Sequence, residues 1–185
     1  SLASAEQFMK VGNIIKSDPD RRYVIPSAPG KRFPKDTKVT DMLYACYAKA
    51  EAGEDFSEIL KAIQERYEEI IQGLSLDLSL EDEFKTIATQ FTNKAGSDYA
   101  ASRGEYLNGI VMANYLGYEF VDPANYIFFD EEGHLDTKKT YPMLSKKLSE
   151  TECAVIPGFY GCGVNGLVQT FSRGGSDVTG SIVAK

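Results

Sequence analysis

Regularly spaced apolar residues predict several helices along the chain. Over residues 5–16, 57–73 and about 80–92, apolar side chains recur every three or four positions, so each segment has one apolar face and is expected to form an amphipathic helix. We predict further helices in four places: after the capping pair Thr40-Asp41, from Ala100 through Tyr115, over about 140–148, and from Ser176 onward.

Short apolar runs bounded by turn residues predict strands. They lie at 23–25, 118–121, 126–129, 154–156 and 167–171. The run Ala154-Val155-Ile156 is apolar throughout, which is typical of a buried parallel strand. Because strands and helices alternate, the pattern favours an α/β layered domain with a largely parallel sheet. Residues 28–38 are rich in Pro, Gly and charge, which predicts an exposed, mobile loop.

Composition excludes some partners. The chain has 27 acidic and 20 basic residues and a net charge of −7, so a nucleic-acid surface would need a local basic cluster. The pairs Arg21-Arg22 and Lys31-Arg32 are too short and too far apart to form one. No run approaches the roughly 18 apolar residues of a membrane span, and the first residues lack the features of a secretory signal. We therefore expect no nucleic acid and no membrane as partners, and a cytoplasmic location.

Cysteine and histidine offer little chemistry. The three cysteines have no CxxC spacing and the chain has one histidine, so neither a disulfide framework nor a zinc or other metal site is indicated. Cys46 and Cys153 lie in apolar patterns and are expected in the core. His134 follows the acidic turn 130–133 and is expected to face solvent.

The stretch 171–181 carries the strongest candidate chemistry. An apolar strand leads into Arg173 and a glycine turn, and a helix is expected to begin at Ser176. Backbone N–H groups at a helix start attract anions, and a guanidinium can hold a carboxylate or phosphate through two parallel bonds. An ordinary tight turn between strand and helix is the alternative.

Three further loops follow predicted strands or open a helix, where ligands of parallel sheets bind. The first loop leads from Ser-Ala-Pro-Gly at 27–30 to Lys-Val-Thr-Asp at 38–41, and the other two are Ala-Ser-Arg-Gly-Glu at 101–105 and Ile-Pro-Gly-Phe-Tyr-Gly at 156–161. The arginine turn itself reads Thr-Phe-Ser-Arg-Gly-Gly-Ser-Asp at 170–177. The order of these segments and their amino-acid sequences resemble those of the aspartokinase family, and the resemblance extends over the whole chain.

The resemblance implies a three-layer αβα sandwich with a largely parallel sheet, the amino-acid kinase (carbamate kinase-like) fold. Residues 1–185 would form its N-terminal, aspartate-binding lobe, with a helical insertion at about 40–95. Members of the family begin with a strand ending in Lys-Phe-Gly-Gly-Ser-Ser, so the phosphate-binding lysine is expected upstream of Ser1. An ATP-binding half and ACT domains are expected after Lys185. On this view the chain is part of a longer protein, is inactive alone and binds no cofactor tightly.

The implied reaction is phosphorylation of the β-carboxylate of L-aspartate by ATP with Mg²⁺. An aspartate side chain has a pKa near 3.9, so the nucleophile is already ionised and needs no general base. The difficulty is to bring one anion against another, which requires positioning, cations and N–H donors.

The resemblance also assigns roles to particular residues. Arg173 would hold a substrate carboxylate, and Glu105 would help to bind the ammonium group. The remaining substrate-binding candidates are the hydroxyls of Ser27, Thr40 and Ser176, the backbone at Gly174 and Gly175, and the ring of Phe159 as a pocket wall. Asp177 is the catalytic candidate, since it could orient the upstream lysine, contact substrate or only cap a helix.

Simpler interpretations exist for two of these residues. Glu105 could be only an acid in the first turn of a helix, and Arg173 could form only a surface salt bridge. For the chain as a whole, the alternatives are a kinase for another acid such as glutamate, and a non-catalytic amino-acid-binding or regulatory module. We expect a homo-oligomer, and loop 28–38 is a plausible lid over the substrate.

Overall fold

The computed structural model of the protein describes residues 2–172 and 175–185. Arg173 and Gly174, two of the predicted site residues, lie outside the described residues. In chain order the elements are α1 (Ala5–Lys16), β1 (Tyr23–Val24), α2 (Val39–Glu51), α3 (Ser57–Gly73), α4 (Glu81–Thr92), α5 (Ser97–Leu116), β2 (Glu119–Phe120), the 3-10 helix η1 (Pro123–Asn125), α6 (Thr137–Ser149), β3 (Ala154–Val155), β4 (Tyr160–Cys162), β5 (Val168–Thr170) and α7 (Gly175–Val183).

Two small sheets organise the strands. β1, β3 and β2 form a parallel sheet in that order, with Tyr23 opposite Ala154 and Glu119 opposite Ala154 on the other side. β4 and β5 form a separate antiparallel pair. The predicted α/β fold with a parallel sheet is therefore confirmed.

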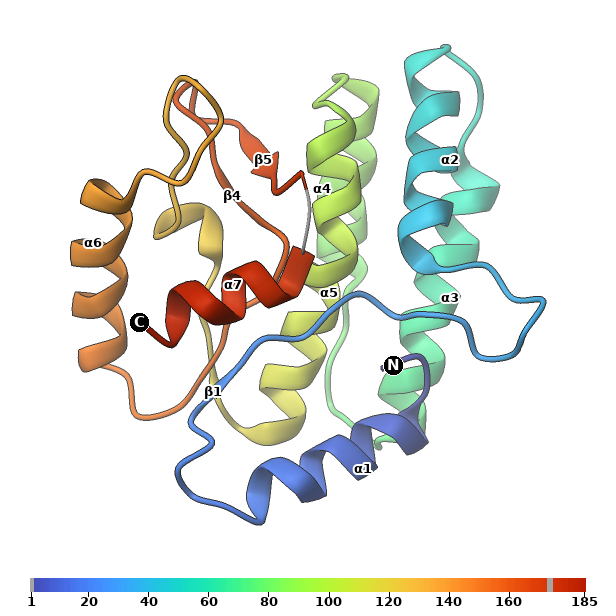
Figure 1. The fold of residues 1–185 in the computed structure, drawn as a ribbon. Helices are drawn as coiled ribbons and strands as arrows, with labels where there is room; N and C mark the ends of the chain where they lie inside the picture. Colours follow the sequence, from blue (N-terminus) through green and yellow to red (C-terminus); the bar gives the residue numbers. More distant parts are fainter. Residues whose placement is uncertain (1, 173–174) are drawn as a thin grey trace.

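The parallel sheet is covered on both faces. Val155 packs into a large cluster built mainly from α1 to α5, whereas its neighbour Ala154 packs into a second cluster with residues of α6 and α7. Successive side chains of a strand point to opposite faces, so this split places helices on both sides of β3. In Figure 1, α2 and α3 lie at one edge of the molecule and α6 at the other, with β1 and α7 between them. The predicted three-layer arrangement follows from this packing.

Several predicted elements differ in detail. α2 begins at Val39, and its N-cap Lys38 makes no side-chain hydrogen bond, so the expected cap at Thr40-Asp41 is wrong. α5 begins at Ser97 rather than near residue 100, and α7 begins at Gly175, one residue before the expected start.

The region between β2 and β5 shows two larger differences. Residues 126–129, predicted as a strand, contribute only isolated bridges, in which Phe128 pairs with Cys162 and Phe129 with Leu135. β4 begins inside the segment 156–161, which the sequence pattern predicts as a loop. It becomes a strand because it pairs with β5, a contact that its own short sequence does not reveal.

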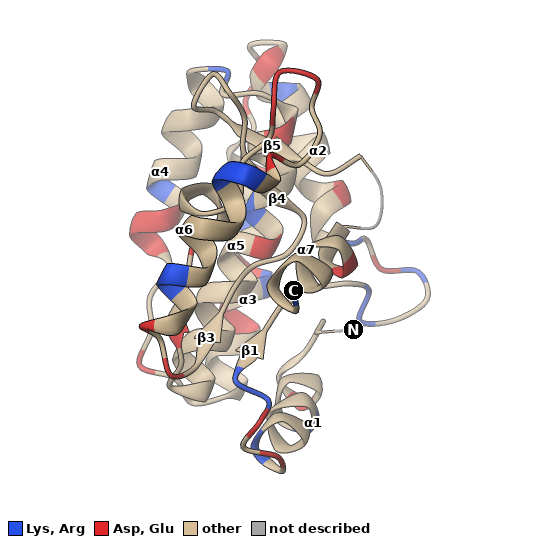
Figure 2. Ribbon diagram, turned by 60° about the vertical axis from the view of Figure 1, so that its left-hand side comes forward, with Lys and Arg blue, Asp and Glu red and all other residues tan. Residues whose placement is uncertain are grey.

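Loop 28–38 is exposed along much of its length, as predicted, but it is tied down at both ends. The buried guanidinium of Arg66 on α3 donates to the carbonyl oxygens of Gly30, at 2.8 Å, and Thr37, at 2.9 Å. The carboxylate of Asp36 lies 3.4 Å from the same guanidinium. Figure 2 shows this charged loop projecting from the body of the molecule between β1 and α2. The base of the loop is therefore fastened to α3, and the expectation that the loop is mobile stays a prediction.

Other predicted features concern charge and exposure. The blue segments in Figure 2 are short and lie on different elements. Cys46 is buried as expected, whereas Cys153 is only half-buried. His134 is exposed, with its ring near the exposed acids of its own turn. Within the part of the chain that the structure describes, no helix has both the length and the apolar character needed to cross a membrane.

Candidate functional site

The carboxyl ends of β1 and β3 bring two of the predicted loops together. The N–H of Gly158, after β3, donates to the carbonyl oxygen of Pro26, after β1, at 3.2 Å. The start of α7 packs onto this junction so closely that a Cβ on Gly158 would lie 2.6 Å from the Cα of Ser176. As a result Ser27 and Ser176, which are 149 residues apart, share a hydrogen bond of 2.9 Å between their hydroxyls.

Helix α5 forms the floor beneath this junction. Gly104 lets the helix approach the loop, since a Cβ there would lie 2.8 Å from the Cβ of Ala28. Glu105 follows, and only 7% of its surface is exposed. Its Oε2 atom is buried without a hydrogen-bond partner among the described residues. Such an atom is costly to bury, so a donor supplied by a ligand or a water would stabilise it.

Burial also changes the proton affinity of this carboxyl group. The pKa of Glu105 is raised from 4.5 to about 7, because the low-polarity surroundings disfavour its charged form. The backbone N–H of Ala28 opposes this by stabilising the carboxylate. The interpretation of Glu105 as a first-turn helix acid is wrong, because α5 begins at Ser97, two turns earlier.

Asn108 lies one turn beyond Glu105 on the same face of α5. Its amide nitrogen donates to the carbonyl oxygen of Ser27 at 2.7 Å, and the side chain is fully buried. Its Oδ1 atom has no hydrogen-bond partner in the described part of the chain. Glu105 and Asn108 therefore contact consecutive residues of the loop after β1, and each holds one unsatisfied acceptor.

Phe159 adopts a backbone conformation that is rare for a bulky residue. Its φ is 85°, in the left-handed region that favours glycine. The surroundings hold it there: its N–H donates to the Thr179 hydroxyl at 3.0 Å, and its carbonyl oxygen accepts from the N–H of Phe171 at 2.9 Å. Strained backbone of this kind is often found at ligand sites.

Helix α2 adds Thr40 and Tyr44 to the same region. The Thr40 hydroxyl would lie 3.8 Å from a Cβ on Gly104, which places it beside α5. The pKa of Tyr44 is raised, first by burial and then by the nearby carboxylates of Asp98, Glu105 and Asp41. The region between α2 and α5 is thus electronegative, which suits a cationic group such as an ammonium.

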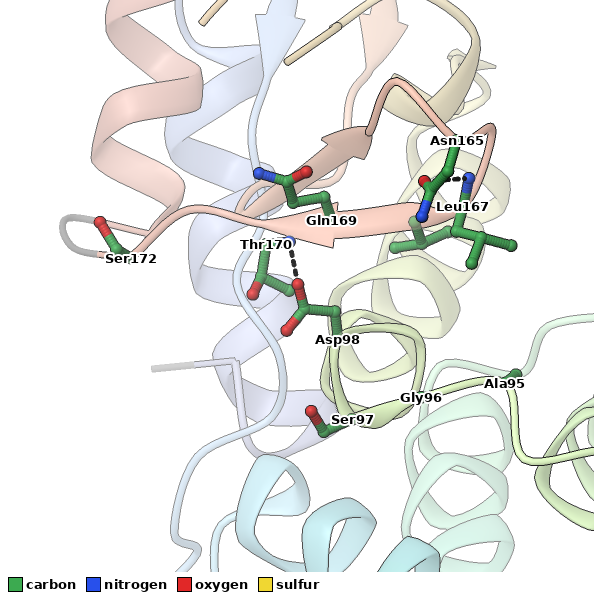
Figure 3. A pocket seen from close by; sticks show the side chains of 10 residues that line it. Ala95, Gly96, Ser97, Asp98, Asn165, Leu167, Gln169, Thr170 and Ser172 are labelled. Atoms are coloured by element: carbon green, nitrogen blue, oxygen red, sulfur yellow. Dashed lines mark hydrogen bonds between the residues drawn. The ribbon is translucent and has the colours of Figure 1, made fainter. Parts of the chain in front are cut away.

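A pocket of about 600 Å³ opens beside this region, between the start of α5 and the β4–β5 pair. Figure 3 shows Asp98 directed toward Thr170, whose N–H donates to the Asp98 carboxylate at 3.1 Å. Ser172, the last described residue before Arg173, lies at its edge. The candidates Ser27, Glu105, Phe159 and Ser176 do not line this pocket, so it adjoins the candidate site without containing it.

The structure thus brings several of the predicted site residues together, and it does not describe two others, Arg173 and Gly174. Ser27, Thr40, Glu105, Phe159 and Ser176 surround the junction of the β1 loop, α5 and α7. Their roles toward a substrate remain predictions.

The stretch around the start of α7 is described only in part. Gly175 opens the helix with φ 41°. Asp177 lies in its first turn and is exposed, with no side-chain hydrogen bond or ion pair among the described residues. Arg173 and Gly174 lie outside these residues, so the common site of Arg173 and Glu105 stays a prediction.

The sequence reasoning missed Asn108, Arg66 and Tyr67. The Tyr67 hydroxyl is fully buried and donates to the carbonyl oxygen of Gly104 at 2.8 Å, directly beside Glu105. A polar residue three positions after Glu105 could have pointed to Asn108. Residues 2–172 and 175–185 contain no group of three or more His, Cys, Asp or Glu side chains arranged to hold a metal ion.

The chain is similar in sequence to known aspartokinases. The chain matches no family model. Over its entire length it is 37% identical to aspartokinase 3 of Bacillus subtilis and 31% identical to chloroplastic aspartokinase 1 of Arabidopsis thaliana. It spans only 44% and 36% of the lengths of those two proteins.

Solved structures give the same result. The crystal structure of Clostridium acetobutylicum aspartate kinase matches all of this chain with a TM-score of 0.97 and 52% identity, over 42% of that enzyme. The structure of Escherichia coli aspartokinase III in complex with aspartate and ADP matches 98% of the chain with a TM-score of 0.80, over 44% of that enzyme. At 22% identity this second match supports the fold alone.

Proposed function

We propose that this chain is the aspartate-binding part of an aspartate kinase, an enzyme that phosphorylates the β-carboxylate of L-aspartate with ATP. Its sequence and its fold are both similar to those of aspartate kinases. This reaction would be the first step toward amino acids derived from aspartate. Because the chain spans less than half of its relatives, the reaction belongs to the whole protein that contains this sequence. A partial chain of this kind is expected to be inactive alone.

The observation that carries the proposal is the environment of Glu105. A nearly buried carboxyl group with one unsatisfied oxygen faces the loop after β1, and further carboxylates make the neighbourhood negative. An ammonium group would satisfy the oxygen and favour the ionised form of Glu105, since opposite charges attract strongly where water is scarce. L-Aspartate carries such an ammonium group.

The carboxylates of L-aspartate need partners of the opposite sign. Among the described residues around the junction, hydroxyls and backbone N–H groups are available from Ser27, Thr40 and Ser176. We propose that Arg173 supplies the fork-shaped cation and that the backbone at Gly174 and Gly175 approaches the ligand. Phe159 would limit the pocket on one side, and Asp177 would act near the transferred phosphoryl group.

ATP and Mg²⁺ fit this chain only in part. The described residues contain no group of three or more His, Cys, Asp or Glu side chains arranged to hold a metal ion. As the family resemblance implies, we propose that other parts of the enzyme hold the Mg²⁺ ion and most of the nucleotide. When bound, ATP with Mg²⁺ supplies the phosphoryl group and neutralises part of its charge. The residues of this chain hold and orient the acceptor, whose carboxylate needs no general base.

The test is phosphoryl transfer by the full-length protein that carries this sequence. We expect release of ADP from ATP to depend on L-aspartate and to be far slower with L-glutamate. Binding of L-aspartate without turnover would instead support a non-catalytic amino-acid-binding module. Preference for another acid would reassign the substrate.

Two variants connect this test to the site. In Arg173→Lys the charge stays but the two-pronged grip is lost, so we expect a KM for L-aspartate at least about tenfold higher. In Asp177→Asn we expect a lower kcat with a smaller change in KM, because a residue that acts on the phosphoryl group stabilises mainly the transition state. Equal kinetic constants in the wild type and both variants would show that these residues are not part of the site.

We also expect the full-length protein to be a homo-oligomer. Light scattering on the same protein measures its oligomeric state.

A further inference from the structure

Arg66 is a nearly buried charged residue outside the candidate site. It lies on α3, with 4% of its surface exposed. Burying a cation is unfavourable unless hydrogen bonds and an opposite charge compensate. The compensation comes almost entirely from one short stretch of chain, namely loop 28–38.

The contacts of Arg66 span the base of that loop. One guanidinium nitrogen donates to the carbonyl oxygen of Gly30 and the other to that of Thr37, and Asp36 provides the negative charge at 3.4 Å. One rigid fork therefore joins the beginning and the end of the loop to α3. A lysine ammonium is a single point of charge and cannot bridge the two carbonyl groups with this geometry.

Both ends of the loop lead directly to candidate site residues. Ala28, two residues before Gly30, contributes the N–H that stabilises the carboxylate of Glu105. Three residues after Thr37, Thr40 lies beside Gly104 in the first turn of α2. The two ends also meet each other, since the N–H of Val39 donates to the carbonyl oxygen of Pro29 at 3.2 Å.

We propose that Arg66 is a positioning residue for the acceptor site, which fixes the Ala28 N–H and the Thr40 hydroxyl by fastening loop 28–38 to α3. This inference rests on the proposed function. It also changes the view of the loop as a lid: in this structure the loop is a fixed wall of the site, and its position is set from the far side by α3.

The chain provides a matched control in Arg32. This arginine lies on the same loop and bonds the same Asp36, at 2.8 Å, but it is much more exposed. Its other partner is Glu69, and it bonds no backbone carbonyl group at the base of the loop. Arg32→Lys therefore perturbs the same charge network without releasing the two loop ends.

The experiment compares Arg66→Lys, Arg32→Lys and the wild type in the full-length protein. We expect Arg66→Lys to raise the KM for L-aspartate at least about tenfold, because losing one hydrogen bond to a charged ligand weakens binding by about this factor. The kcat and the KM for ATP should change less than about twofold, because the groups that Arg66 positions are proposed to hold the acceptor equally in the ground state and the transition state. Arg32→Lys should leave all three constants near their wild-type values.

An unchanged KM for L-aspartate in Arg66→Lys overturns the inference, and so does a parallel rise in both KM values, which would indicate general loss of structure. If Arg66→Lys does not fold, the double variant Arg66→Gln with Asp36→Asn removes both charges together and must show the same split.

Hydrogen exchange separates this inference from the proposed function. Amide exchange of residues 28–38 should become faster in Arg66→Lys and not in Arg32→Lys, whether or not the protein phosphorylates aspartate. If the wild type has no activity toward aspartate, the proposed function fails, and equal exchange in the two variants then refutes the fastening of the loop by Arg66.

Discussion

Replacing Glu105 with glutamine should make the protein more stable and less active. The folded state raises the pKa of Glu105 from 4.5 to about 7, so between these pH values it binds more protons than the unfolded chain does. The free energy of unfolding therefore falls as the pH rises through this window. The wild type keeps the full contribution of the neutral side chain only below about pH 4.5.

The magnitude follows from the shift itself. A difference of about 2.5 pH units at roughly 1.4 kcal/mol per unit means that ionised Glu105 lowers stability by about 3 kcal/mol above pH 7. Glutamine has the shape of the protonated acid and stays neutral. We expect Glu105→Gln to raise the free energy of unfolding by up to about 3 kcal/mol near pH 8, and by only about 1 kcal/mol near pH 5.

Urea unfolding at both pH values measures this difference, with Glu131→Gln in the exposed turn before His134 as a control that should change little. In the full-length protein, Glu105→Gln should bind L-aspartate much more weakly, because the negative charge facing the ammonium group is gone. A loss of stability near pH 8, or a gain that does not depend on pH, would refute the reasoning. The first result would mean that the ionised carboxylate has a structural partner in the resting protein, and the second that folding does not raise the pKa of Glu105.

Three further predictions concern the surroundings of Glu105. Tyr67→Phe should lower the free energy of unfolding by about 1 kcal/mol in urea titrations, because it removes the buried hydrogen bond that the Tyr67 hydroxyl donates to the carbonyl oxygen of Gly104. Gly158→Ala should push Ser176 and the start of α7 away from the loop after β1, which we expect to cost about 1 to 3 kcal/mol in the same assay and to weaken aspartate binding. The affinity for L-aspartate should rise by close to tenfold per unit between about pH 5.5 and 6.5 and level off above pH 7, because Glu105 must lose its proton to hold an ammonium group; calorimetric titration at several pH values measures this.

The sequence predicted the outer helices well because their signal is local. α3 covers 57–73 as expected, since one apolar face repeats along the whole helix and the ends carry turn residues. α5 was placed less accurately, and the physical reason is its position in the centre of the fold. It is buried on nearly all sides, so it has no polar face to reveal its period or its start at Ser97.

The candidate site was predictable only as a set of loops. The residue types at Ser27, Glu105 and Phe159 could be selected because they follow strands or match a family pattern. Their environment could not, because burial and strain come from contacts between segments far apart in the chain. Arg66 illustrates the difference: in the sequence of α3 it is one polar residue among several, and it becomes buried because loop 28–38 covers it.

The departures from ordinary local rules gather at one place. Phe159 has a left-handed backbone, Glu105 is a buried carboxyl group with a raised pKa, and Asn108 holds an unsatisfied acceptor, all at the carboxyl ends of β1 and β3. Each lowers the stability of the folded chain, and such costs are expected where a ligand compensates for them. If these residues had only a structural role, substitutions that remove the strain or the buried charge would raise the free energy of unfolding without lowering activity. The proposed site requires a different result, in which Glu105→Gln raises the free energy of unfolding and weakens the binding of L-aspartate.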